Sequence, residues 1–303
     1  MGCIRKIKIG NIQNNHVNPI KSKKHRVSFR AGLPNSFVEY VKHADVNKIT
    51  TKLSNMGFLA DFKGCKTVAA CTEKTVEIFK KYNLSIPKSL TFEPIQEKDT
   101  AGSYYSILKH VTINSDIKNF YDINLLNKME ESQKYFHPTK HFLATFIHEF
   151  SHNAHYENII KNHGLEKANA IWDELRSRKI TAFWAKFYNG NYSKKNILEY
   201  MSETITKKIA GNLDENLNFI NYPKLGFVKR IKSNDFRYDM YGDRYTLYDK
   251  NIFEAMKITD SAIWNGDIEF LYRDGFGIKG QINFKEINSY FNTAKQFKEL
   301  LKG

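Results

Sequence analysis

The 303-residue chain has few cysteines and no long apolar run. Its three cysteines, Cys3, Cys65 and Cys71, are too few and too irregularly spaced for a disulfide framework or a four-thiolate zinc site. No stretch approaches the roughly 20 apolar residues of a transmembrane helix, and the first residues lack the apolar core of an ordinary secretory signal. We therefore expect a cytoplasmic protein, or one secreted or delivered without an ordinary signal peptide.

Acidic residues are absent from the first thirty positions, although the chain contains 32 of them. The basic residues in that stretch supply about half of the net charge of +15. We interpret residues 1–33 as a basic disordered tail. Because the charge is concentrated there, it does not indicate a nucleic-acid-binding surface over the rest of the chain, and nucleic acid is not an expected partner.

The first three residues of this tail have one feature of lipid-anchored proteins. Gly2 after the initiator Met1, with Cys3 beside it and basic residues following, resembles the start of doubly acylated eukaryotic proteins. Lys6, however, stands where that pattern prefers Ser or Thr. We favour a simple basic extension, whose association with anionic membranes would be weak.

The rest of the chain has the apolar content of a folded protein, with 41% hydrophobic residues overall. Apolar spacing predicts one or two helices over 35–55, interrupted near Asp45, then a strand region over 59–71 and a helix over 73–82 capped by Thr72. The patterns further predict an extended segment at 90–92 and a strand or hairpin over 103–114. They also predict a helix from Pro138 to Gly164 and further helices over 165–187, 197–210 and from 284. Aromatic-rich segments, such as 252–264, precede the helix from 284.

The long predicted helix contains the pattern H-E-x-x-H at His148–His152. Histidines four residues apart lie on one face of a helix, so His148 and His152 can bind one Zn²⁺ at about 2.0–2.1 Å. Glu149 then points toward the remaining coordination position, where a general base is needed. The alternative is a solvated polar stripe, but apolar residues flank the motif, and burial without a metal would be costly. The pattern therefore predicts a zinc site.

Two further histidines in this helix, His141 and His155, complicate the ligand assignment. The metzincin pattern places a Gly three residues after the second ligand and a third His three residues later. Here those places are held by His155 and Asn158. We therefore expect His155 to be a neighbour of the site or a surface residue rather than a ligand.

A hydrolytic zinc site has three protein ligands and an open position, so a third ligand is required. Glu199 and Glu203 share one face of the helix predicted from residue 197, and one can bind metal while the other holds a ligand imidazole. Asn196 and Glu199 also fit a simple capping box. The spacing favours Glu199 as the ligand and Glu203 as its support. The alternatives that stay open are Glu203, Glu157, Glu166 and Glu174.

The two motifs together resemble the zinc-peptidase domain of anthrax lethal factor and its relatives, a gluzincin branch, over roughly residues 103–210. The second motif of that family has a Tyr seven residues before the ligand Glu, an aromatic residue after it, a small residue and a second Glu. Those places are held here by Tyr192, Glu199, Tyr200, Ser202 and Glu203. Ser151 and Ser202 replace the usual Gly and Ala, and neither change removes a ligand.

These motifs imply a zinc-dependent endopeptidase acting on a peptide or protein substrate with Zn²⁺ as cofactor. Glu149 accepts a proton from the attacking water and returns it to the leaving amine. The resemblance implies that Tyr192 donates its phenol to the developing oxyanion. The alternative is a non-catalytic module that binds nucleic acid or acidic surfaces on a degenerate zincin fold, and the intact motif argues against it.

We expect an α+β, zincin-like fold that is mainly helical with a small sheet. Its expected parts are the tail (1–33), a helical N-terminal segment (34–62), the catalytic core (63–215) and a mostly helical extension packed on the core (216–303). Part of Tyr104–Asn114 is expected to form an edge strand along which the substrate lies, because an unpaired strand edge offers main-chain hydrogen bonds.

Overall fold

The computed structural model describes residues 33–97, 100–115, 141–180, 189–190, 192–226 and 252–268. The chain divides into two units, Met1–Arg30 and Ala31–Gly303, and every described residue belongs to the second. The basic tail, the start at Pro138 and the helix from 284 lie outside the described residues. The four-part division of the chain stays a prediction.

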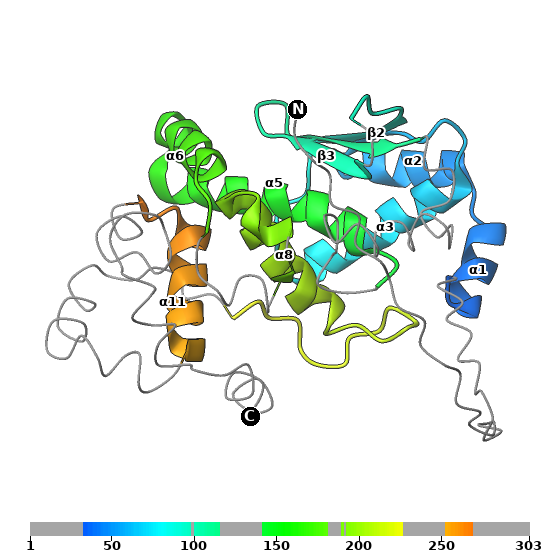
Figure 1. The fold of residues 1–303 in the computed structure, drawn as a ribbon. Helices are drawn as coiled ribbons and strands as arrows, with labels where there is room; N and C mark the ends of the chain where they lie inside the picture. The colour runs from blue at the N-terminus through cyan, green and yellow to red at the C-terminus, as the bar shows by residue number, and fades with distance from the viewer. Residues whose placement is uncertain are drawn as a thin grey trace, which may run out of the picture. The chain divides into compact units, whose positions relative to one another are not determined.

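Two short helices, α1 (Asn35–Lys42) and α2 (Val46–Ser54), begin the described chain (Figure 1). Asp45 separates them, because its side chain accepts the backbone N–H groups of Asn47 at 2.9 Å and Lys48 at 3.1 Å. This N-cap satisfies two of the unpaired donors at the start of α2. The predicted interruption near Asp45 is confirmed.

Four strands form one mixed sheet in the order β1–β2–β4–β3. Their bounds are Leu59–Asp61 for β1, Ser89–Glu93 for β2, Gly102–Tyr105 for β3 and His110–Asn114 for β4. β2 pairs in parallel with β1 and β4, whereas β3 pairs antiparallel with β4. The α+β prediction is confirmed. β4 is internal, so the edge predicted within Tyr104–Asn114 is restricted to β3.

Helix α3 (Lys66–Lys81) corrects the prediction for the segment after β1. The strand region predicted to reach Cys71 ends at Asp61, and Thr72 lies inside the helix, fully buried, rather than at its cap. The run from Val68 to Cys71 is buried in the core, so packing extends α3 beyond what local cap signals indicate.

Helix α5 (Ala144–His163) contains the H-E-x-x-H motif. It begins at Ala144, after a turn in which the Ala144 N–H donates to the carbonyl of His141 at 2.9 Å, so the predicted helix is not continuous through residues 141–143. Gly164 ends it as predicted, with φ of 79°, a conformation that favours a residue without Cβ. Phe150, inside the motif, packs against Phe58 and Phe79 and anchors the opposite face of α5 in the core.

Three further helices complete the surroundings of α5: α6 (Leu165–Ser177), α8 (Ile197–Ala210) and α11 (Ile252–Asn265), with a short 3-10 turn, η1 (Tyr192–Lys194), before α8. α8 has the predicted bounds. α6 ends before the predicted position 187, because Arg178 is extended and its carbonyl accepts the Ile197 N–H at 3.0 Å.

α5 contacts β3, α6, α8 and α11, so the metal-motif helix lies between the sheet edge and α8 (Figure 1). None of the helices in the described ranges has the length and apolar character needed to cross a membrane.

Candidate metal centre

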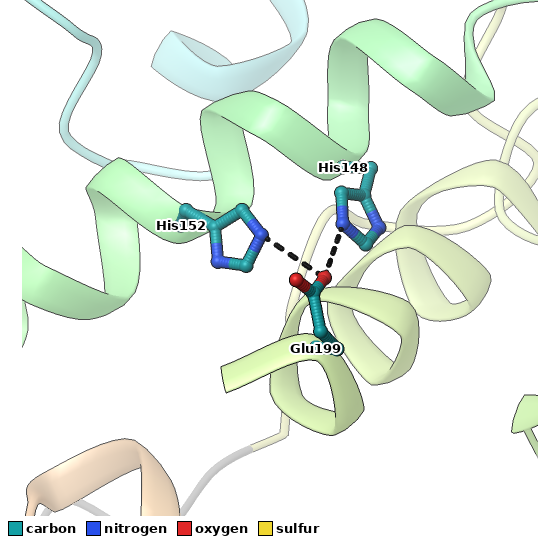
Figure 2. Close-up of side chains that lie close together, drawn as sticks. All are labelled: His148, His152 and Glu199. Atoms are coloured by element: carbon teal, nitrogen blue, oxygen red, sulfur yellow. Dashed lines mark hydrogen bonds and ion pairs between the residues drawn. The ribbon is translucent and has the colours of Figure 1, made fainter. Parts of the chain in front are cut away.

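Two turns of α5 and the first turn of α8 bring three side chains to one point (Figure 2). Glu199 Oε2 lies 3.0 Å from His148 Nε2 and 3.4 Å from His152 Nε2. Each of the three residues offers a donor atom, and these atoms all lie within 4.8 Å of one another. Both histidines are buried, and His148 is only 2% exposed. The structure thus brings together the three residues favoured as ligands.

The two distances from Glu199 to the histidine donors fit a tetrahedral metal ion. Two bonds of about 2.0–2.1 Å at a tetrahedral angle separate their donor atoms by roughly 3.3 Å. The two histidine-to-carboxylate distances of 3.0 and 3.4 Å lie on either side of that value. The donor set, two imidazoles and one carboxylate, leaves a fourth position for water or substrate. The group can therefore hold a metal such as Zn²⁺.

The electrostatics of this group favour a cation. Burial raises the pKa of the Glu199 carboxyl, but the charge of His152 and the hydrogen bonds from both histidines hold that pKa well below its usual range. Burial lowers the pKa of the His148 imidazole, yet its bonds to Glu199 and Glu203 raise that pKa well above its usual range. Carboxylates surround His148 so closely that they attract a proton, and a metal ion supplies the same positive charge.

Glu203 lies behind the group. Its Oε1 is 2.7 Å from His148 Nδ1, on the ring edge away from Glu199, and its side chain is fully buried. A carboxylate in this place fixes the orientation of a metal-binding imidazole and raises its basicity. Glu203 thus lies beside His148, and its supporting role stays a prediction. Glu157 and Glu174, the other described candidates with partners, pair with Lys109 and Arg178.

The Asn196–Glu199 pair combines a helix cap with a metal donor, the two interpretations given by the sequence. Asn196 Oδ1 accepts the backbone N–H of Glu199 at 2.9 Å and caps α8. The Glu199 side chain does not return to complete the capping box; it turns to the two histidines. The cap therefore fixes the backbone from which the carboxylate reaches the metal position.

The three donors open into a cleft of about 1030 Å³ between β3 and the start of α8. Glu149, Tyr192 and all of β3 also line it. A Cβ added to Gly102 would come 2.8 Å from Glu149 Cγ, so β3 passes directly beside the predicted general base. The Tyr192 ring centroid lies 5.8 Å from that of His148. The structure thus places both predicted catalytic side chains in the cleft with the metal group.

Two aromatic residues that the sequence did not assign to the site also contact it. The Tyr104 ring lies parallel to that of His152, with centroids 6.1 Å apart, and its hydroxyl donates to Asn153 Oδ1 at 3.1 Å. Trp172 packs edge-on against both rings. Tyr104 lies in a predicted strand, but the only sequence signal for Trp172 is an apolar helix position.

His155 lies in the interior and binds α11, so the prediction that it could be a surface residue is wrong. It is fully buried and its Nε2 donates to the carbonyl of Ile263 at 2.8 Å. Its helix neighbours Asn158 and His163 donate in the same way to Trp264 and Asn265. The last carbonyls of a helix have no partner within it, and here α5 supplies those partners.

The helix of the third donor is also joined to α11. The hydroxyl of Tyr200, the residue after Glu199, donates to Asp260 Oδ1 at 2.7 Å. Burial raises the pKa of Asp260 to about 6, although Lys208 and Tyr200 lower it. α11 thus contacts both helices that carry the metal group.

Comparison with known proteins identifies no relative from which a function could be inferred. No family model, no curated protein and no solved structure matches this chain. The case for a metal centre therefore rests on the donor spacing, burial and charge of His148, His152 and Glu199.

Proposed function

We propose that the protein is a zinc-dependent endopeptidase of the gluzincin type, with a site like that of the lethal factor relatives. The observation that supports it is the His148, His152 and Glu199 group, which lines one cleft with Glu149. Two histidines and a glutamate are the ligand set of known zinc peptidases. A carboxylate beside an open metal position is suited to general-base chemistry.

In the proposed reaction each side chain has one task. Zn²⁺ held by His148, His152 and Glu199 would polarise the peptide carbonyl and lower the pKa of water to about 7. Glu149 accepts a proton from the attacking water and returns it to the amine as the C–N bond breaks, so that one water is consumed for each bond. Glu203 holds the His148 ring through Nδ1.

The edge strand β3 suits the binding of an extended substrate. It pairs on one side with β4, and it lines the cleft with Ser103, Tyr104 and Tyr105. Among the described strands no other lies on its second side. A peptide added there gains main-chain hydrogen bonds that do not depend on its sequence. Within the predicted range Tyr104–Asn114, Ile107 and Leu108 lie in the turn and β4 is internal, so β3 is the part that can offer this edge.

Metal analysis and a peptide-library digest of the purified chain test this function. We expect about one zinc per chain, and cleavage of internal peptide bonds that stops when a chelator removes the metal and resumes when zinc is restored. A chain that neither contains nor takes up zinc, and that cleaves no peptide, would support the alternative of a non-catalytic binding module.

The contact between Gly102 and Glu149 gives a test of the cleft geometry. Gly102→Ala places a methyl group against Glu149 Cγ, so we expect kcat to fall roughly 10–100-fold with zinc content unchanged. Ser103→Ala, on the same strand, adds no atoms and is the matched control. A kcat for Gly102→Ala equal to that of the control would show that Glu149 is not positioned by this close approach.

Tyr192→Phe tests the proposed oxyanion donor. Removing one such donor typically lowers kcat by about 10²–10³-fold, while substrate binding and zinc content should change little. Tyr105→Phe, in a half-exposed residue of the same cleft, is the control. If the two variants have the same kcat, Tyr192 does not stabilise the transition state.

A further inference from the structure

The cleft carries opposite charges at its two ends. Its charged lining outside the metal group and Glu149 consists of Glu93, Glu97, Arg176 and Lys195. Within the described part of the chain, Glu93, Glu97 and Arg176 form no ion pair. Lys195 precedes α8, on the α8 side of the cleft, and its Nζ lies 5.5 Å from the centroid of the Tyr192 ring. The other three charges can be placed along β3.

The acidic end lies at the start of β3. The segment that carries Glu93 and Glu97 leads from β2 into Gly102, and it is fixed to the end of β4, where Asn114 donates its N–H to Ala101 at 3.0 Å. Gly102 itself lies beside Glu149. The two carboxylates therefore flank the cleft on the Gly102 side of the metal group.

The basic end lies near the other end of the strand. Tyr104 contacts His152 of α5 and Trp172 of α6. His152 lies about one turn further along α5 than Glu149. Arg176 follows Trp172 by one turn of α6 and, like Trp172, lines the cleft. From Gly102 to Tyr104 the cleft thus changes from negative to positive.

The direction of the substrate follows from the pairing of strands. Antiparallel pairing is the more stable arrangement per residue, so a peptide on the outer edge of β3 runs opposite to it. Its N-terminal part then lies at the Tyr104 end, near Arg176, and its C-terminal part at the Gly102 end, near Glu93 and Glu97. Charges at the rim of a binding site steer a ligand and set its register.

We propose, on the basis of the endopeptidase function above, that the cleft selects peptides with an acidic residue on the N-terminal side of the cleaved bond and a basic residue on its C-terminal side. Arg176 attracts the acidic side chain, and Glu93 with Glu97 attract the basic one. Exposed charges contribute modestly, so we expect about a tenfold preference at low salt that weakens toward 1 M salt.

Two peptides of identical composition test the proposal, one with acidic residues N-terminal and basic residues C-terminal to a shared central sequence, and one with the charges exchanged. Their kcat/KM values are compared for the zinc-loaded full chain, and their Kd values by fluorescence anisotropy for zinc-loaded Glu149→Gln. We expect the first peptide to be preferred in both measurements. Arg176→Glu combined with Glu97→Lys should reverse the preference, whereas Lys179→Glu with Glu166→Lys, the same charge changes outside the cleft lining, should leave it.

The two measurements separate this inference from the function on which it rests. Equal Kd values, a preference for the exchanged peptide, or a preference that survives the cleft charge reversal would overturn the proposed selectivity. A Kd preference in the expected direction without cleavage of either peptide by the unmutated chain would overturn the endopeptidase function and leave the selectivity standing.

Discussion

Glu149→Gln is expected to lower kcat by about 10²–10⁴-fold while the protein keeps its zinc, because the change removes the base without removing a ligand. Gln has nearly the shape of Glu, so the contact between residue 149 and Gly102 is kept. Zinc content and kcat, measured on the same preparation, check this result.

Glu157→Gln is the matched control for Glu149→Gln. Glu157 lies on the same helix and loses the same charge, but it pairs with Lys109 and does not line the cleft. Its kcat should stay near that of the unmutated chain. Full activity of Glu149→Gln would mean that another group takes the proton, and loss of zinc would mean that Glu149 belongs to the metal-binding set.

Glu199→Ala and Glu203→Ala should separate a metal ligand from the group that supports one. Loss of Glu199 removes one of three donors, and we expect zinc affinity to fall more than 100-fold. Loss of Glu203 removes the partner of His148 Nδ1, a change that typically costs about 10–100-fold in affinity or activity. Competition with a chromophoric chelator measures both affinities.

The Glu203 side chain is fully buried, whereas that of Glu199 is partly exposed, so removal of Glu203 can also destabilise the fold. Glu203→Gln keeps the size of the side chain and a hydrogen-bonding oxygen, so it distinguishes loss of support from loss of fold. If Glu203→Gln binds zinc more weakly than Glu199→Ala while both are folded by circular dichroism, the two roles are exchanged.

The parts of the fold that follow from local patterns were predictable from sequence. α8 begins and ends as expected because Asn196 caps it and its apolar face has helical spacing. The break at Asp45 is visible for the same reason. The metal group was predictable because α5 places its two histidine donors at i and i+4, and because the Asn196 cap and the helical spacing of α8 mark the turn that carries Glu199.

Features that depend on contacts between distant segments were not predictable. The early start of α3 depends on burial of its apolar run rather than on a cap. Which part of the hairpin forms the sheet edge depends on the parallel pairing of β4 with β2. The place of Trp172 beside His152 depends on the packing of α6, and no local pattern encodes that contact.

The attachment of α11 to α5 has a consequence for biosynthesis. His155 leaves the ribosome 108 residues before Ile263, whose carbonyl it binds. At about 5–20 residues per second, translation leaves α5 without this partner for roughly 5–20 s. A nascent chain that stops before Ile252 contains every donor of the metal group but lacks the helix that holds α5 and α8. We therefore expect ribosome-arrested chains to take up zinc more tightly once Asn265 has emerged, a difference that metal uptake by chains of the two lengths would reveal.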